Sequence, residues 1–305
     1  MKITRTRLSL ALAGTAVAAL ALAGCASGGD PLDGGSSGDA GGGDSETIVV
    51  GSQTYYSNEI IAEIYAQALE GAGFTVERKF NIGQRDAYIP SLEDGSVDLF
   101  PEYTGNLLQF FEPDATATTS DEVYAQLQEA LPDGLTVLDQ SSATDQDSYN
   151  VTSAFADENG LTTIGDLAGI TPLVLGGAPE LETRPYGPTG LKEIYGVDVT
   201  FNPTADTTVA ELVAGNIQVA NVYSADPAIG INDLVTLEDP DGLLLASNVV
   251  PVVNADIADE IADVINAVSA ALTPEGLVAL NVESTVDERS SADIAKDWLA
   301  ANNLG

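Results

Sequence analysis

Hydrophobic and polar positions follow two different periods between residues 47 and 100. Three short runs rich in β-branched residues have strand character, whereas apolar residues between them recur at helical spacing. Ser57 can cap the first helical stretch, and Gly71 and Gly73 can end it. The predicted strands are 47–53, 74–80 and 96–100. This order of strand, helix, strand, helix and strand predicts a parallel sheet covered by helices on both faces.

The same alternation returns along the rest of the chain. Amphipathic helical stretches separate further short apolar runs, and residues 256–302 predict two or three successive helices, with Trp298 as a core residue. The later predicted strands are 135–139, 171–177, 197–203, 217–223, 235–239 and 247–254. The pattern is typical of an α/β fold, and 305 residues suffice for one large domain or two lobes.

Two segments resemble each other within the chain. Residues 92–103 (LEDGSVDLFPEY) and 212–223 (LVAGNIQVANVY) share a leucine, a glycine, a β-branched residue and a final tyrosine in register. Two lobes built alike would each place one tyrosine, Tyr103 or Tyr223, at the carboxyl end of a strand. Open α/β sheets bind ligands at that edge, although units of helix, glycine and strand are common enough for chance to be the alternative.

The first 24 residues form a separate segment. Lys2, Arg5 and Arg7 precede an uncharged stretch, and small residues lead to Cys25, which predicts a secretory signal peptide over 1–24. A membrane-spanning anchor is the alternative, but the stretch is rich in alanine and short for a span. Residues 25–46 are mostly Gly, Ser and Asp, and we interpret them as a flexible tether.

The charge of the chain limits its partners. Removal of residues 1–24 takes away three positive charges and no negative ones, so the formal net charge falls from −37 to −40. Such a surface disfavours nucleic acid and anionic membranes and attracts a cationic ligand, or it only keeps the protein soluble.

The residue types also limit the chemistry. The chain has no histidine and one cysteine, so a Ser–His pair is excluded and a metal site is poorly supported; we expect no cofactor. A pair of carboxylates for glycoside cleavage is not excluded by 47 acidic residues, but no pair stands out.

Tyrosines in predicted loops offer another kind of site. Tyr103, Tyr149 and Tyr223 each lie at a predicted strand end. A quaternary ammonium group has no N–H to donate, and aromatic faces attract it through their quadrupole, by roughly 0.5–2 kcal/mol per contact. Ordinary packing with a solvated hydroxyl is the alternative for each tyrosine.

Several ordered motifs identify a family that the chain resembles. Residues 50–70 (VGSQTYYSNEIIAEIYAQALE) are similar to an opening in which a strand ending Gly-Ser-Lys precedes an aromatic residue and a helix. Residues 91–106 (SLEDGSVDLFPEYTGN) resemble a motif ending Pro-Glu-Tyr-Thr-Gly-Thr. Both belong to the substrate-binding lipoproteins of osmoprotectant ABC importers, which take up glycine betaine, choline and related quaternary amines. The motif around Cys25 resembles the bacterial lipobox, which implies lipidation of this cysteine.

The resemblance implies a fold and a set of ligand contacts. The fold would be α/β, of the two-lobe periplasmic-binding-protein type (type II), with lobe 1 over 47–148, lobe 2 over 149–247 and a return to lobe 1 over 248–305. The family's binding positions fall on Tyr103, Tyr149 and Tyr223 for the cation, with Asp147 beside them, and on Arg184 for a carboxylate. A surface ion pair with Glu180 or Glu182 is the alternative role for Arg184.

Four residues depart from the family pattern. Gln53 replaces a lysine, Asn106 a threonine, Tyr186 an aspartate and Ser247 a tyrosine. Because of these changes, the resemblance does not determine which ligand the protein binds. Tyr56, Tyr88 or Tyr186 could complete the aromatic cage.

Together these observations predict a binding lipoprotein rather than an enzyme. It would be tethered through Cys25 to the outer face of the cytoplasmic membrane, and as a monomer it would deliver a small zwitterion or cation to the permease of an ABC importer. An extracellular hydrolase with paired carboxylates, or a ligand-sensing module of the same fold, are the alternatives.

Overall fold

The structure is a computed structural model, and it describes residues 47–305. The predicted signal peptide, the lipidation site Cys25 and the predicted tether lie outside the described residues. All of the described helices and strands, and every hydrophobic core cluster that they form, belong to one compact unit, Asp44–Gly305.

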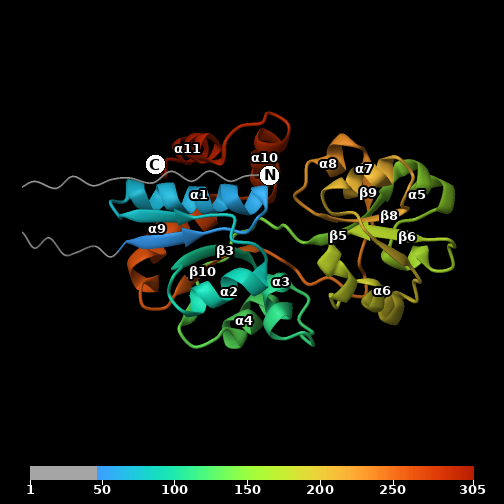
Figure 1. Cartoon of the computed structure of the whole chain (residues 1–305), viewed down its shortest axis with the longest axis horizontal. Helices are drawn as coiled ribbons and strands as arrows, with labels where there is room; N and C mark the ends of the chain where they lie inside the picture. Colours follow the sequence, from blue (N-terminus) through green and yellow to red (C-terminus); the bar gives the residue numbers. More distant parts are fainter. Residues whose placement is uncertain (1–46) are drawn as a thin grey trace, which may run out of the picture. The chain divides into compact units, whose positions relative to one another are not determined.

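The sheet of lobe 1 combines early strands with one strand from near the C-terminus (Figure 1). Its order is β2-β1-β3-β10-β4. β1 pairs in parallel with β2 and β3, whereas β10 runs antiparallel to β3 and β4. The strands are β1 (Ile48–Gly51), β2 (Val76–Lys79), β3 (Leu99–Tyr103), β4 (Leu135–Val137) and β10 (Val249–Asn254). The sheet is therefore mixed rather than parallel throughout, because the chain returns through β10.

The sheet of lobe 2 repeats this arrangement. Its order is β7-β6-β8-β5-β9, with β6 parallel to β7 and β8, and with β5 antiparallel to β8 and β9. The strands are β5 (Asp147–Thr152), β6 (Val174–Gly177), β7 (Thr200–Pro203), β8 (Val219–Tyr223) and β9 (Leu234–Thr236). β3 and β8 occupy equivalent places in the two sheets, and both end on a tyrosine.

The internal sequence repeat has a matching backbone. Gly95 and Gly215 each precede the third strand of their lobe with a positive φ, 72° and 77°. A residue with a side chain adopts this left-handed conformation at a cost, so glycine is favoured where the helix stops and the strand begins.

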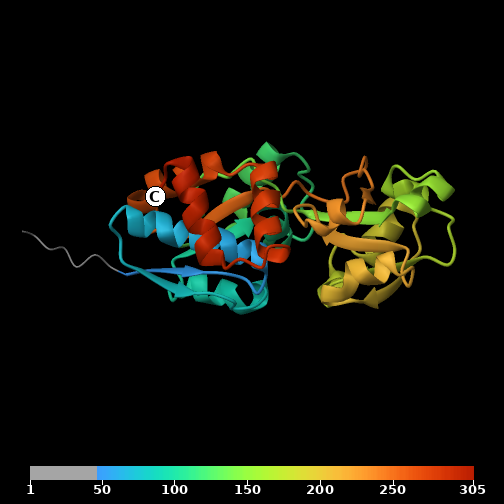
Figure 2. The same ribbon diagram turned by 90° about the horizontal axis from the view of Figure 1, so that it is seen from above.

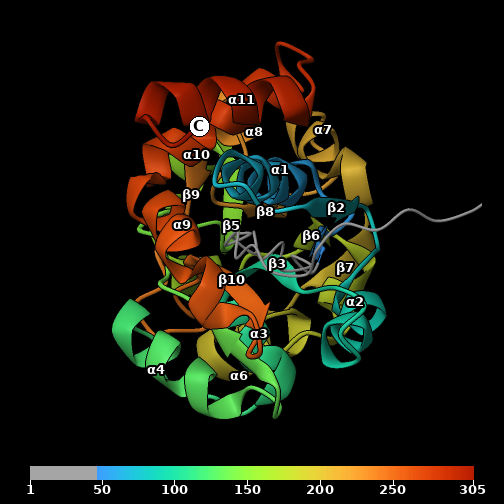
Figure 3. The same ribbon diagram turned by 90° about the vertical axis from the view of Figure 1, so that its left-hand side faces the viewer.

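Helices cover both faces of the lobe 1 sheet (Figures 1 and 3). One face packs on α1, α9, α10 and α11 through a core that includes Ile61, Ile265 and Leu277. The opposite face packs on α2, α3 and α4 through a second core that includes Phe100 and Leu127. Figure 2 shows α1 beside the C-terminal helices. The helices are α1 (Tyr56–Gly71), α2 (Arg85–Glu93), α3 (Thr104–Phe111), α4 (Ser120–Ala130), α9 (Ala258–Ala271), α10 (Pro274–Thr285) and α11 (Ser291–Asn302).

Lobe 2 has smaller layers. α5 and α6 pack on one face of its sheet in a core that includes Tyr149, Leu175 and Leu191, and α7 and α8 pack on the other beside Ile217 and Val222. Full burial of one such aliphatic side chain contributes about 1.5–3 kcal/mol, so these cores hold each lobe together. The helices are α5 (Ser153–Asn159), α6 (Pro188–Tyr195), α7 (Thr208–Val213) and α8 (Ala228–Ile231).

The pairing of β1 with β3 stops short of the carboxyl end of β3, at one edge of the lobe 1 sheet. β1 ends at Gly51, whereas β3 continues to Tyr103. Asn58 of α1 fills the interval, because its amide nitrogen donates to the Pro101 carbonyl (2.7 Å) and its amide oxygen accepts from the Gln53 backbone N–H (2.8 Å). A proline is tolerated at position 101 because no strand lies beside it on that side to require an N–H donor.

Two local predictions were wrong. Tyr103 ends β3 as predicted, but Thr104 begins α3 directly, so a helix that was not predicted replaces the expected loop after this strand. Tyr149 lies within β5 rather than at a strand end, since the polar sequence Asp147–Thr152 is itself a central strand of lobe 2.

Within residues 47–305, no single helix has both the length and the apolar character needed to cross a membrane. One bent pair, α9 with α10 at 88°, meets these criteria by length and composition.

Candidate ligand-binding site

A small pocket opens beyond the carboxyl ends of the central strands. It encloses about 260 Å³ of empty space, part of it open to solvent. The residues that line it are Gln53, Tyr55, Arg85, Tyr103, Asn106, Asp145 and Tyr223. Gln53 follows β1, Tyr103 ends β3 and Tyr223 ends β8, so the pocket lies at the sheet edge where open α/β folds bind ligands.

Three tyrosine rings form the aromatic part of the pocket. The Tyr55 ring is tilted by 51° against the Tyr223 ring, with 5.1 Å between the ring centroids, and its centroid is 4.8 Å from that of Tyr56. Tyr103 is 5% exposed, and its buried hydroxyl has no hydrogen-bond partner among the described residues. An unpaired buried hydroxyl is costly unless a ligand or water satisfies it.

A buried carboxylate lies beside these rings. Asp145, which is 2% exposed, accepts hydrogen bonds from the Tyr55 hydroxyl and the Ala225 backbone N–H, both at 3.1 Å. Burial raises its pKa to about 7, and the negative charge of Asp226 adds to the shift, while the two hydrogen bonds oppose it. No ion pair within residues 47–305 involves Asp145.

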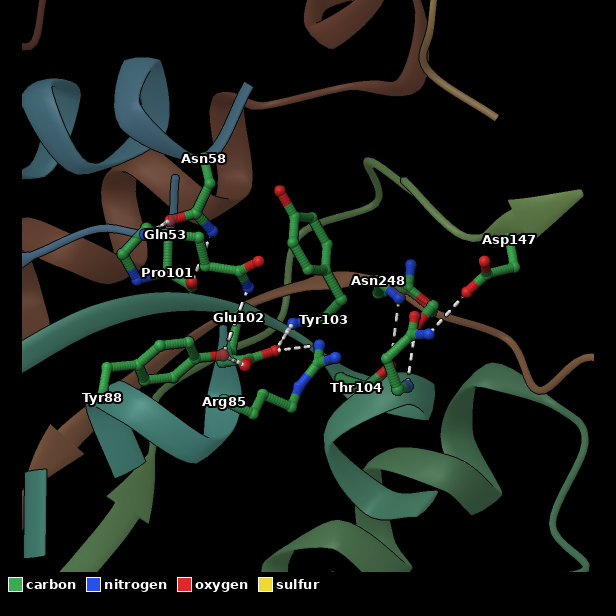
Figure 4. Close-up of polar contacts among 12 residues, drawn as sticks. Gln53, Asn58, Arg85, Tyr88, Pro101, Glu102, Tyr103, Thr104, Asp147 and Asn248 are labelled. Atoms are coloured by element: carbon green, nitrogen blue, oxygen red, sulfur yellow. Dashed lines mark hydrogen bonds and ion pairs between the residues drawn. The ribbon is translucent and has the colours of Figure 1, made fainter. Parts of the chain in front are cut away.

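The one cationic side chain of the lining is already paired. Arg85, at the start of α2, donates from Nη2 to Oε2 of Glu102 (2.8 Å), and both side chains are buried. Glu102 also accepts from the Tyr103 backbone N–H (2.7 Å) and from the Tyr88 hydroxyl (Figure 4). Gln53 donates to the Tyr88 hydroxyl (3.2 Å). Burial alone would lower the pKa of Arg85, but the Glu102 carboxylate outweighs it and raises that pKa.

Three of the four residues that depart from the family pattern bond to one another. Ser247 donates to the Asn106 amide oxygen (2.8 Å) and accepts from the Asn106 backbone N–H (3.1 Å). The Asn106 amide nitrogen donates to Asp147 Oδ2 (2.7 Å) and to the Tyr186 hydroxyl (3.2 Å). Burial raises the pKa of Asp147, and the bond from Asn106 opposes that shift. Asn106, Tyr186 and Ser247 therefore belong to one polar cluster.

The structure brings together some of the predicted site residues and not others. Tyr103, Tyr223, Gln53 and Asn106 line the pocket, and Asp147 contacts Asn106. Tyr149 instead lies fully buried in the lobe 2 core, where its hydroxyl donates to the Tyr186 backbone carbonyl. The aromatic ring that packs against Tyr223 is that of Tyr55, not that of Tyr149.

Arg184 lies half-buried just after a short 3₁₀ helix, Pro179–Thr183, and outside the pocket lining. Across the described residues its guanidinium makes no ion pair, so the pairing with Glu180 or Glu182 is not formed. Burial raises the pKa of Tyr186, and the positive charge of Arg184 opposes that shift.

Three lining residues were missed from the sequence. Tyr55 had a usable signal, since an aromatic residue is part of the family's opening motif, but Asp145 and Arg85 had none. Asp145 lies in an acidic loop like many others in this chain, and Arg85 begins an ordinary amphipathic helix. The described residues contain no group of three or more metal-ligating side chains.

The fold and the pocket define a solute-binding protein with two α/β lobes. A crystal structure of a glycine betaine/carnitine/choline ABC transporter protein superposes with a TM-score of 0.72 at 20% identity, over 84% of this chain and 99% of that one. This likeness confirms the predicted type II periplasmic-binding-protein fold.

The sequence comparisons give the family. The OpuAC family, the substrate binding domain of ABC-type glycine betaine transport systems, matches residues 46–301, and the chain belongs to it. The glycine betaine-binding protein YehZ of Escherichia coli is 25% identical over 273 residues, 83% of this chain and 89% of that protein. A glycine-betaine-binding protein of Pseudomonas aeruginosa is 25% identical over 284 residues, 85% and 89% of the two chains.

Proposed function

We propose that this protein captures a small quaternary ammonium solute of the glycine betaine or choline kind outside the cytoplasmic membrane and delivers it to an ABC importer. The observation that carries the proposal is the pocket that Tyr55, Tyr103 and Tyr223 line together with a buried carboxylate, Asp145. The known ligands of the family and of its relatives are of this kind.

The pocket matches the physical problem that such a ligand sets. A quaternary ammonium group cannot donate hydrogen bonds, so only aromatic faces and negative charge can attract it. Each aromatic contact contributes roughly 0.5–2 kcal/mol, depending on desolvation, and several together offset the cost of immobilising a small ligand. The pocket offers both kinds of contact.

The remaining site residues have proposed roles. We assign Tyr103 and Tyr223 to the cationic end of the ligand, and Gln53 and Asn106 to polar contacts, with Asp147 holding Asn106. Arg184 is a carboxylate contact that comes into reach when the lobes close on a zwitterion, a motion common among extracytoplasmic binding proteins. Tyr149 supports the binding residues from the core of lobe 2.

We assign the remaining parts of the chain to the delivery of the solute to the importer. Cleavage before Cys25 and lipidation of its thiol would anchor the protein to the outer face of the membrane, with residues 25–46 as a tether. The lobes would comprise 47–148 with 248–305, and 149–247. The beginning of β10 at Val249 supports the return to lobe 1, whereas β5 of the lobe 2 sheet already begins at Asp147, two residues before the proposed limit. The closed monomer would dock on the permease without catalysing a reaction.

A thermal-shift and calorimetric screen tests the proposal. The compact unit Asp44–Gly305 is titrated with choline, glycine betaine, carnitine, ectoine and amino acids. We expect a quaternary amine to raise the melting temperature and to be recovered unchanged afterwards. A response to amino acids alone, or hydrolysis of an added glycoside, would refute the proposed function.

A further inference from the structure

The charged groups of the pocket do not balance. Arg85 is the one cationic residue of the lining, and Glu102 neutralises it through a buried ion pair. Asp145 has hydrogen-bond donors but no cation beside it. When Asp145 is deprotonated, the pocket therefore carries one negative charge in excess, on a carboxylate that is 2% exposed.

From this imbalance we infer that the site selects a ligand with a net positive charge over a zwitterion, with Asp145 as its counter-charge. The inference rests on the proposed function and narrows its substrate class to quaternary amines of the choline kind, which carry no carboxylate. A buried charge is tolerated when it is paired, and an incoming cation pairs with Asp145 where a neutral zwitterion leaves the excess unchanged.

The groups around Asp145 fit a bound cation. Tyr55 donates to it, and its charge acts on the Tyr55, Tyr56, Tyr103 and Tyr223 hydroxyls, raising the pKa of each alongside the effect of burial. Asp145 lines the same pocket as Tyr55, Tyr103 and Tyr223. Asp226 lies close enough to raise the pKa of Asp145 and adds a second negative charge. A trimethylammonium group among these rings would meet the negative potential of the aromatic faces that it contacts and of the Asp145 carboxylate.

The same pocket offers little to a ligand carboxylate. Gln53 is neutral, and its amide nitrogen already donates to Tyr88. Arg85 keeps a buried Nε–H without a partner, but its charge is offset by Glu102, which would repel a second carboxylate. Arg184 lies outside the lining. A zwitterion would therefore bring its carboxylate toward Asp145, Asp147 and Glu102, and only Arg184, once closure brings it into reach, would give that carboxylate a positive partner.

The test compares two ligands that share a trimethylammonium group and differ in charge. Choline and glycine betaine are titrated into the Asp44–Gly305 protein by calorimetry at pH 8 and low salt, with Asp145→Asn as the variant. Asp157→Asn, which removes one exposed carboxylate from α5, is the matched control. We expect the wild-type protein to prefer choline by about tenfold or more, and Asp145→Asn to lose most of that preference by weakening choline. The control should behave like the wild type.

The outcomes separate this inference from the proposed function. If glycine betaine binds as tightly as choline or tighter, the preference for a cation is wrong while the proposed function stands. Equal weakening of both ligands in Asp145→Asn also overturns it. If neither ligand binds a folded wild-type protein, the proposed function fails and the inference with it. If Asp145→Asn fails to fold, two other measurements still test the inference. One is the ratio of choline to glycine betaine affinity in the wild-type protein. The other is the same ratio in Tyr55→Phe, which removes only one hydrogen bond to Asp145.

Discussion

The Asn106 amide nitrogen lies 2.7 Å from Asp147 Oδ2, which joins α3 of lobe 1 to β5 of lobe 2. Ser247 holds the other side of the Asn106 amide. Residues 106, 186 and 247, which depart from the family pattern that the sequence resembles, are thus hydrogen-bond partners within one cluster.

The first prediction concerns this cluster. Ser247→Ala should lower the free energy of unfolding by about 1–3 kcal/mol, because the fully buried Ser247 satisfies both the backbone N–H and the amide oxygen of Asn106. Chemical denaturation measures this loss. Asn106→Ala should lose stability too, and the double variant should lose less than the sum. Strict additivity would show that the cluster is not coupled.

The aromatic rings should matter more than their hydroxyls. Tyr103→Ala and Tyr223→Ala should each weaken a quaternary amine by about tenfold with the fold retained, because each removes one wall of the pocket. Tyr103→Phe is the matched control, since it keeps the ring and removes an unpaired buried hydroxyl. Its affinity should stay within about twofold of the wild type. Unchanged calorimetric affinity in both alanine variants would contradict an aromatic cage.

Arg184 should distinguish ligands by their carboxylate. Arg184→Ala should weaken glycine betaine more than choline, because a guanidinium without an ion pair is available to a carboxylate when the lobes close. Lys296→Ala, on α11 of the opposite lobe, controls for the general loss of one positive charge. Equal effects on both ligands would assign Arg184 a structural role.

Binding of a cation should depend on pH through Asp145. Burial raises its folded pKa to about 7, above its ordinary value, so the empty protein holds a proton there below pH 7 that the unfolded chain has released. The contribution of Asp145 to stability therefore falls as pH rises from about 4 to 7. A cation favours the charged carboxylate and expels the proton.

Choline affinity should accordingly increase from pH 5 to pH 7 and then level off. Calorimetry in two buffers with different ionisation enthalpies should detect proton release near pH 6. Asp226, whose pKa burial also raises, titrates in the same direction, so Asp145→Asn is needed to assign the effect. A pH profile that is the same in this variant and in the wild type would assign it elsewhere.

The Arg85–Glu102 pair should be the costliest ion pair to break. Glu102→Gln should destabilise the protein by about 3–5 kcal/mol, because it leaves a buried guanidinium without its counter-charge. Lys192→Gln breaks the exposed pair with Asp198 and should change stability little. A similar small effect in both variants would show that water reaches Arg85 freely.

The sequence by itself determined the local elements and their order. The periods of apolar residues, the glycine stops and the repeated segment predicted most strands and helices and the placement of Tyr103 and Tyr223 at equivalent strand ends, because these features depend on neighbours in the chain. Where the pattern was polar, as in Asp147–Thr152, the strand was missed, since burial there comes from the whole of lobe 2.

Tertiary structure alone decided which side chains meet. Tyr149 turns into the core while Tyr55 stands beside Tyr223, and residues 106 and 247, distant in sequence, share two hydrogen bonds. Nothing local marks Asp145 as a buried carboxylate without an ion pair, because its environment is assembled from Tyr55 just before α1, from Tyr103 of β3 and from the segment that follows β8. Which side chains meet depends on the order of the strands within the two sheets. The spacing of residues along the chain does not determine that order.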